Sequence, residues 1–236
     1  MSGHSHFATI KRQKESKDAA KGNIFGKLSK TISIAIKAGG GTNPDMNFKL
    51  RVAIDKAREF NMPKDNIDRI LKTADQKMDS IEEITYEGFG PHNLSLIVET
   101  ATDNKNRTAQ EIKSLFEKGG GAMGGPNSVA YNFDHKGYLL IEKKEDIDTQ
   151  TLALIDLGVE DIEDNEDGIV VFTSPSELKD VRGRVADAGF SILKTELTMI
   201  PKTYLEVSDT TQIEKITKFI ESFENHDDVQ RVYHNF

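Results

Sequence analysis

Ten lysine and arginine side chains lie in the first 51 residues of the chain, and side chains of this type bind phosphate groups. They are Lys11, Arg12, Lys14, Lys17, Lys21, Lys27, Lys30, Lys37, Lys49 and Arg51. Cationic side chains gain affinity for a polyanion because they release the counterions condensed on its phosphates. We therefore predict that this part of the chain binds nucleic acid. The alternative interpretation is a basic surface that is merely solvated.

The charge of the chain is divided between its two ends. Residues 1–72 contain fifteen Lys and Arg against seven Asp and Glu, whereas residues 73–236 contain sixteen against thirty-two. The net charge of −8 conceals this division. A positive segment on a negative body suits a module that binds polyanions, because the acidic remainder limits unspecific adhesion.

A second group of polar residues follows a predicted strand at 94–100 and offers another anion contact. Its members are Asn104, Lys105, Asn106, Arg107 and Thr108. Thr108 and Glu111 have the spacing of a capping box, which predicts that a helix begins there. Free amides at a helix start, together with two cations, can hold a phosphate. Alternatively, the polar side chains only shape the turn.

Catalytic chemistry has little support in the sequence. There is no cysteine, and the six histidines lack the spacing of zinc ligands. The glycine-rich run 119–126 is not followed by the Gly-Lys-Ser/Thr of a nucleotide loop, so we interpret it as a helix-to-strand connection. The acidic run 163–168 lacks the bidentate glutamate of a calcium loop. We predict no catalytic residue, no metal and no cofactor, with a metal-dependent enzyme acting on nucleic acid as a remote alternative.

The elements that position the cations are predicted from apolar spacing. From Asn23 onward, apolar residues recur at steps of three and four, as on one face of an amphipathic helix. The pattern repeats from Leu50 and again after Pro63, which suits the first position of a helix. We predict a basic arm over residues 1–22, a basic three-helix domain over 23–75, and a polar linker at 73–82. Lys27, Lys30 and Lys37 lie off the apolar stripe, so we expect their ammonium groups to face solvent.

The remainder of the chain alternates strands with helices. Residues 136–200 have the order β-α-β-β-α-β, which is the split βαβ or ferredoxin-like order. Residues 83–134 and 202–236, with strands expected at 128–133 and 204–207, contain β-α-β twice. We predict an α+β multidomain fold in which a small helical N-terminal domain precedes two ferredoxin-like (split βαβ) domains. One is discontinuous, formed by 83–134 plus 202–236, and the acidic one at 135–201 is inserted in it.

The predicted inserted domain is acidic, and this affects its partners. Residues 142–167 contain eleven Asp and Glu against two Lys. Such a surface either favours solubility or provides a face for a basic protein. No apolar run approaches the ~20 residues that cross a bilayer, and the N-terminus has no export signal. We expect a cytoplasmic protein that does not bind a membrane.

Several motifs, in order along the whole chain, point to one family. They are Gly3-His4-Ser5, Ile10-Lys11, residues 61–67, residues 86–91, residues 102–108, and residues 119–133 with Ser128-Val129 inside. Together they closely resemble the YebC/PmpR family of probable transcriptional regulators. The resemblance implies a helical N-terminal domain followed by two α+β domains, in agreement with the order of elements.

The resemblance also implies a role with nucleic acid. Family members are described as DNA-binding regulators of transcription. A mitochondrial relative is described as a translational activator, and bacterial relatives have been linked to the ribosome. We therefore expect a nucleic-acid-binding regulator of gene expression, first a DNA-binding transcriptional regulator and second a ribosome- or RNA-associated translation factor. The chain departs from the family at His6-Phe7, where Lys-Trp is common, and at Thr9, where Asn is common. Phe7 stacks on a base more weakly than tryptophan.

Overall fold

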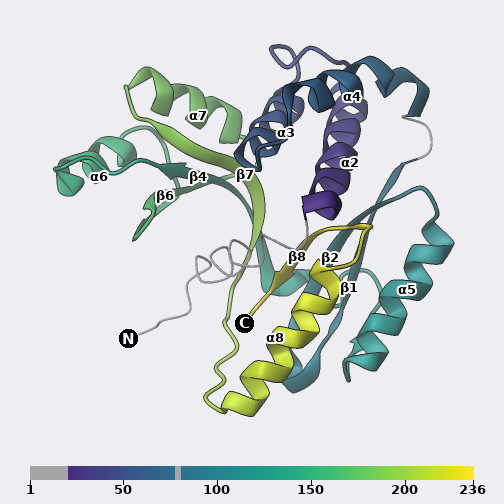
Figure 1. The fold of residues 1–236 in the computed structure, drawn as a ribbon. Coiled ribbons are helices and arrows are strands. Elements are labelled where there is room, and N and C mark those ends of the chain that lie inside the picture. The colour runs from purple at the N-terminus through teal and green to yellow at the C-terminus, as the bar shows by residue number, and fades with distance from the viewer. Residues whose placement is uncertain (1–20, 78–80) are drawn as a thin grey trace. The chain divides into compact units, whose positions relative to one another are not determined.

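The computed structural model describes residues 21–77 and 81–236 and divides the chain into two compact units. The outer unit consists of Met1–Phe133 with Pro201–Phe236, and the inserted unit is Asp134–Ile200. Figure 1 shows the elements of both units. The predicted α+β multidomain class is confirmed, while the finer domain boundaries stay a prediction.

Three helices form the N-terminal part of the outer unit. They are α2 (Lys21–Gly39), α3 (Phe48–Glu59) and α4 (Lys64–Lys77). Apolar residues from all three build one core, including Ile32, Leu50 and Ile67. Asn47 joins α2 to α3, because its side chain accepts from the Leu50 amide and donates to the Ala35 carbonyl. Helix α4 extends into the segment predicted to be a linker.

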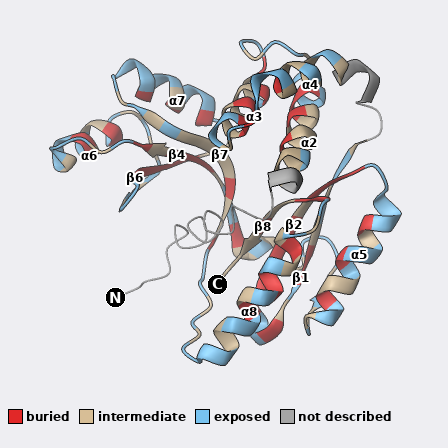
Figure 2. Cartoon of the chain, in the orientation of Figure 1, coloured by how far each residue is buried: buried red, intermediate tan, exposed pale blue. Residues whose placement is uncertain are grey.

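A four-stranded antiparallel sheet forms the rest of the outer unit, in the order β3-β1-β2-β8. Its strands are β1 (Glu82–Phe89), β2 (Ser95–Thr102), β3 (Ala122–Met123) and β8 (Val229–His234). Its helices are α5 (Lys105–Lys118) and α8 (Thr210–Glu224), and its two short 3-10 helices are η2 (Pro91–Asn93) and η3 (Ala130–Asn132). Leu96, Val98, Phe116 and Phe223 share its core, and Figure 2 shows the buried residues along β2 and one side of α8.

This sheet has the predicted split arrangement in space, but the chain follows another path through it. Helix α5 connects β2 to β3, and β1 lies between these two strands. The strand between them, β1, therefore comes before the segment β2-α5-β3 in the sequence. The strand expected at 204–207 is not formed, and its Leu205 amide donates to the Asn235 carbonyl outside any sheet. The strand expected at 128–133 is wrong as well, because η3 covers 130–132.

The inserted unit has the predicted ferredoxin-like order. Its elements are β4 (Phe133–Ile141), α6 (Ile147–Ile155), β5 (Asp161–Asn165), β6 (Gly168–Thr173), α7 (Leu178–Asp187) and β7 (Ile192–Pro201). The strand order is β5-β6-β4-β7, so β6 separates β4 from β5. Every residue of β6 is buried, as expected for an inner strand.

The glycine-rich connection after α5 is tightly packed. A Cβ on Gly119 would collide with the ring of Phe219, and one on Gly121 would collide with the Phe89 carbonyl. These glycines therefore allow close approach of backbone to neighbouring atoms. None of the described helices is long and apolar enough to cross a membrane.

Candidate nucleic-acid interface

The predicted cations of the arm lie outside the described residues. These are Lys11, Arg12, Lys14 and Lys17, together with His6, Phe7 and Thr9. Lys21 begins α2, but its side chain also lies outside the described part. For all of these positions, phosphate binding stays a prediction.

The remaining predicted cations fall into two classes. Lys37 and Lys49 are exposed. Arg51 instead donates to the Pro44 carbonyl and pairs with Asp45 at 3.1 Å. Arg51 is therefore engaged by the α2–α3 connection, whereas Lys37 is exposed as expected.

Lys27 and Lys30 also have internal partners, at the end of α8 and on the turn that follows it. The ammonium group of Lys27 donates to the Glu224 carbonyl at 2.6 Å, and that of Lys30 lies 2.6 Å from Asp228. Burial lowers the pKa of Lys27, although the nearby carboxylates of Asp227 and Glu224 act in the opposite sense. The expectation that these two ammonium groups face solvent is wrong for Lys27 and holds only in part for Lys30, which is 28% exposed, because each binds an internal oxygen.

Helix α4 carries a set of exposed cations that sequence reasoning missed. They are Lys64, Arg69 and Lys72, all three exposed. Lys37, Lys64, Arg69 and Lys72 form no ion pair with another residue in the described part of the chain. The signal was available for two of them, because Arg69 and Lys72 are three residues apart and lie opposite the apolar positions 67, 70, 71 and 74 of the helix.

Asp228, immediately before β8, is the centre of a buried polar cluster. Its Oδ1 accepts from Lys30, and its Oδ2 accepts from Arg107 at 2.8 Å and from Thr108 at 2.7 Å. Only 6% of its side chain is exposed. Burial by itself would raise the pKa of Asp228, but the hydrogen bonds from Lys30, Thr108 and Arg107 outweigh it and hold that pKa well below its ordinary range.

Two residues of the second predicted anion contact, Arg107 and Thr108, therefore bind an internal carboxylate, and binding of an external anion there stays a prediction. Helix α5 begins at Lys105, and the Asn104 side chain caps it by accepting from the Arg107 amide. The capping box predicted to start at Thr108 is absent, since Thr108 lies inside the helix and binds Asp228. Lys105 and Asn106 are exposed.

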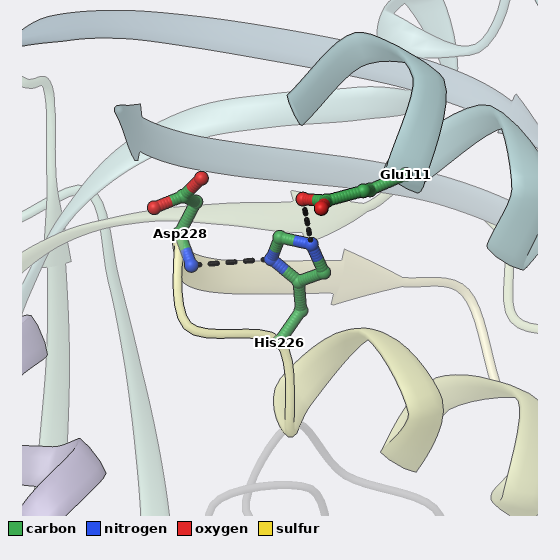
Figure 3. Close-up of side chains that lie close together, drawn as sticks. All are labelled: Glu111, His226 and Asp228. Carbon is green, nitrogen blue, oxygen red and sulfur yellow. Dashed lines mark hydrogen bonds and ion pairs between the residues drawn. The ribbon is translucent and has the colours of Figure 1, made fainter. Parts of the chain in front are cut away.

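Glu111 and His226 extend this cluster, and their side chains lie close to Asp228, as Figure 3 shows. The His226 Nδ1 accepts from the Asp228 amide at 3.1 Å, so its proton resides on Nε2, which lies 3.0 Å from Glu111. A metal ion needs a lone pair at Nε2 and free carboxylate oxygens. Both Asp228 oxygens are already bound to donors, so the arrangement fits a hydrogen-bonded cluster better than a metal site.

An open cleft of about 980 Å³ lies over the cluster. Its lining includes both cations and acids, namely Lys30, Arg107, Lys118, Asp103, Glu111, Asp227 and Asp228. Arg107 keeps 45% of its side chain exposed there and Lys30 keeps 28%. The two cations are therefore reachable from solution while they hold Asp228.

Comparisons with known proteins cover the whole described chain. Residues 5–77 match the TACO1/YebC protein N-terminal domain, and residues 81–236 match the TACO1/YebC second and third domain. A "probable transcriptional regulatory protein" of Dictyoglomus turgidum is 44% identical, covering 100% of this chain and 96% of that relative. One from Caldanaerobacter subterraneus is 43% identical, with 100% and 98% covered. The crystal structure of a conserved hypothetical protein from Aquifex aeolicus is similar with a TM-score of 0.82 and 35% identity, covering 93% of this chain and 91% of that one.

Proposed function

Because the chain belongs to the TACO1/YebC family, we propose that it is a nucleic-acid-binding regulator of gene expression, acting as a DNA-binding transcriptional regulator. The curated relatives carry the name of probable transcriptional regulatory proteins. The observation that carries the proposal is the set of exposed cations on the N-terminal helices, since such side chains bind phosphates. Its site is proposed to include the ten cations predicted from the sequence and the three on α4.

The connection between α3 and α4 supports duplex DNA as the target. Four residues, 60–63, join the two helices, and Asn61 has a left-handed backbone with φ +58. This length is typical of a helix-turn-helix, whose second helix enters the major groove. Helix α4, with its exposed Arg69 and Lys72, is the second helix of the pair.

The experiment compares two triple variants that remove equal charge. K64Q/R69Q/K72Q removes the α4 cations, and K179Q/K215Q/K218Q removes three exposed lysines of other helices. The plot of log affinity for a DNA duplex against log salt should become shallower by up to about 2.7 in the first variant, because each lost phosphate contact contributes about 0.9. It should stay unchanged in the second. Equal slopes in both variants contradict the assignment to α4.

Two exposed aromatic residues favour the second candidate function, a ribosome- or RNA-associated translation factor. Tyr131 is 64% exposed and Phe89 is 40% exposed. Phe89 pairs with Ser95, and the Ser95 hydroxyl accepts from Asn132, next to Tyr131, so the two rings occupy the same end of the outer sheet. Exposed rings stack on unpaired bases, which RNA loops offer more than a duplex does. Competition between ribosomal subunits and duplex DNA at equal salt separates the two candidates.

The proposed role is not catalytic and is placed in the cytoplasm. The atoms of Glu111, His226 and Asp228 that could bind a metal ion already form hydrogen bonds with one another or with Lys30 and Arg107. We therefore propose no metal-dependent reaction.

A basic protein is proposed as partner of the inserted unit. Helix α6 exposes Leu152 and Ile155 on one face, three residues apart, next to the exposed acids Asp148 and Asp156. This pattern suits a segment that is both basic and apolar. L152S/I155S should weaken binding of a helical Lys/Leu peptide more than L193S, which changes another exposed leucine of the same unit. Equal weakening contradicts the assignment.

A further inference from the structure

Lys30 and Arg107 hold the same buried carboxylate from two different helices. Lys30 belongs to α2 and Arg107 to α5, and their cationic groups lie 2.6 and 2.8 Å from Asp228 oxygens. In the sequence Lys30 is 198 residues and Arg107 is 121 residues from Asp228. A fixed pair of cations around one anion is therefore already assembled in the folded protein.

We propose that Lys30 and Arg107 form a phosphodiester-binding site, and that Asp228 occupies this site until a nucleic acid displaces it. The inference rests on the proposed function and names a site for it. A carboxylate and a phosphate both present two oxygens to cationic donors, so the groups that bind Asp228 also bind a phosphodiester. Asp228 acts as an internal competitor for the nucleic acid.

The surroundings of the pair permit the exchange. Both cations line the open cleft, so a phosphate reaches them from solution while Asp228 is still in place. When a single phosphate displaces Asp228, one anion replaces another, so the gain in binding free energy is small. A nucleic acid gains more, because its neighbouring phosphates also engage the exposed cations on the N-terminal helices.

Displacement also loosens the attachment of α2 to the α8–β8 turn. Besides Lys30, α2 is held by Lys27, which donates to the Glu224 carbonyl at the end of α8, and by Thr31, which donates to Gln230 in β8 at 2.9 Å. A ligand that takes Lys30 removes the Lys30–Asp228 ion pair from this attachment and leaves the bonds of Lys27 and Thr31 in place. Occupation of the site and the docking of α2 are therefore linked.

The test compares three full-length variants by their binding of labelled nucleic acid. D228N frees both cations. D227N removes the same charge from the exposed neighbouring residue and frees neither of them. T108V removes one of the donors to Asp228 without changing the charge, so a response of T108V cannot come from net charge. The probes are a DNA duplex of about 20 base pairs and a single-stranded RNA of about 20 nucleotides, measured by fluorescence anisotropy at several salt concentrations.

The expected result is a steeper salt dependence in D228N than in D227N. The two freed cations should add up to about 1.8 to the slope on the duplex, or about 1.4 on the single strand, and raise affinity roughly tenfold at low salt. T108V should show a smaller increase in the same direction. If D228N and T108V both keep the slope of D227N, the site is refuted while the proposed function stands. If no variant and no wild-type protein binds either probe, both are refuted. The probe that responds identifies the type of nucleic acid.

Discussion

Replacing Asp228 by Asn tests how strongly the buried cluster stabilises the outer unit. The substitution keeps the size of the side chain but removes the charge that Lys30 and Arg107 share. Breaking a buried ion pair by removing one partner typically costs about 3–5 kcal/mol. Lys30 is 28% exposed and Arg107 is 45% exposed, so water solvates both after the change. We therefore expect a loss of only about 2–3 kcal/mol.

Circular dichroism is the suitable measurement, because the chain has no tryptophan to report unfolding by fluorescence. For a protein of this size, 1 kcal/mol corresponds to about 2–4 °C in Tm, so D228N should melt about 4–12 °C below the wild type. Urea titration should give the same loss in free energy with an unchanged slope.

D227N is the matched control, because Asp227 is exposed and its substitution removes the same charge as D228N. Its Tm should stay within about 2 °C of the wild type. If D228N melts together with D227N, the cluster contributes nothing measurable to the stability of the fold, and the reasoning from burial and donor count is wrong.

Three further predictions concern stability. The pKa of Asp228 lies below its ordinary value of 3.8, so its contribution to the free energy of unfolding is present above that pH and is lost as the pH falls toward the folded-state pKa. In urea titrations the difference in free energy of unfolding between wild type and D228N should be full at neutral pH and shrink below pH 3.8. A difference that stays constant with pH contradicts the assignment. N47A removes three hydrogen bonds of a buried helix cap and should lower the free energy of unfolding by about 2 kcal/mol in urea titrations. N43A, at an exposed turn, should lower it by less than about 0.5 kcal/mol. Equal losses in the two variants would show that the cap does not stabilise the fold. G119A places a methyl group against Phe219 and should lower Tm, while G26A, with open space around it inside α2, should raise stability by up to about 1 kcal/mol; a neutral G119A refutes the packing argument.

The sequence predicted the local elements well where one face of an element is buried. The spacing of Leu50 and Ile54 gave α3, and the order of strands and helices in 136–200 gave the inserted ferredoxin-like sheet. These predictions succeed because apolar periodicity is a local property of helix and strand geometry. The motifs along the chain likewise gave the family, which the matches over 5–77 and 81–236 confirm.

The outer sheet shows that local apolar periodicity does not predict which strands pair. Residues 82–89 and 204–207 both alternate like strands, but only the first segment pairs with β2 and β3. Which strand fills the central position depends on partners more distant in the sequence than any local pattern reaches. The sequence therefore supported the right type of sheet but with two wrong strands, at 128–133 and 204–207.

The sequence by itself determined the family and the division of charge between the two ends of the chain. Only the tertiary structure decided that Lys27 binds the end of α8, and that Lys30 and Arg107 both bind Asp228. The physical reason is separation: the Lys30–Asp228 pair joins positions 198 residues apart, and no one-dimensional pattern records which opposite charges folding brings within 3 Å of each other.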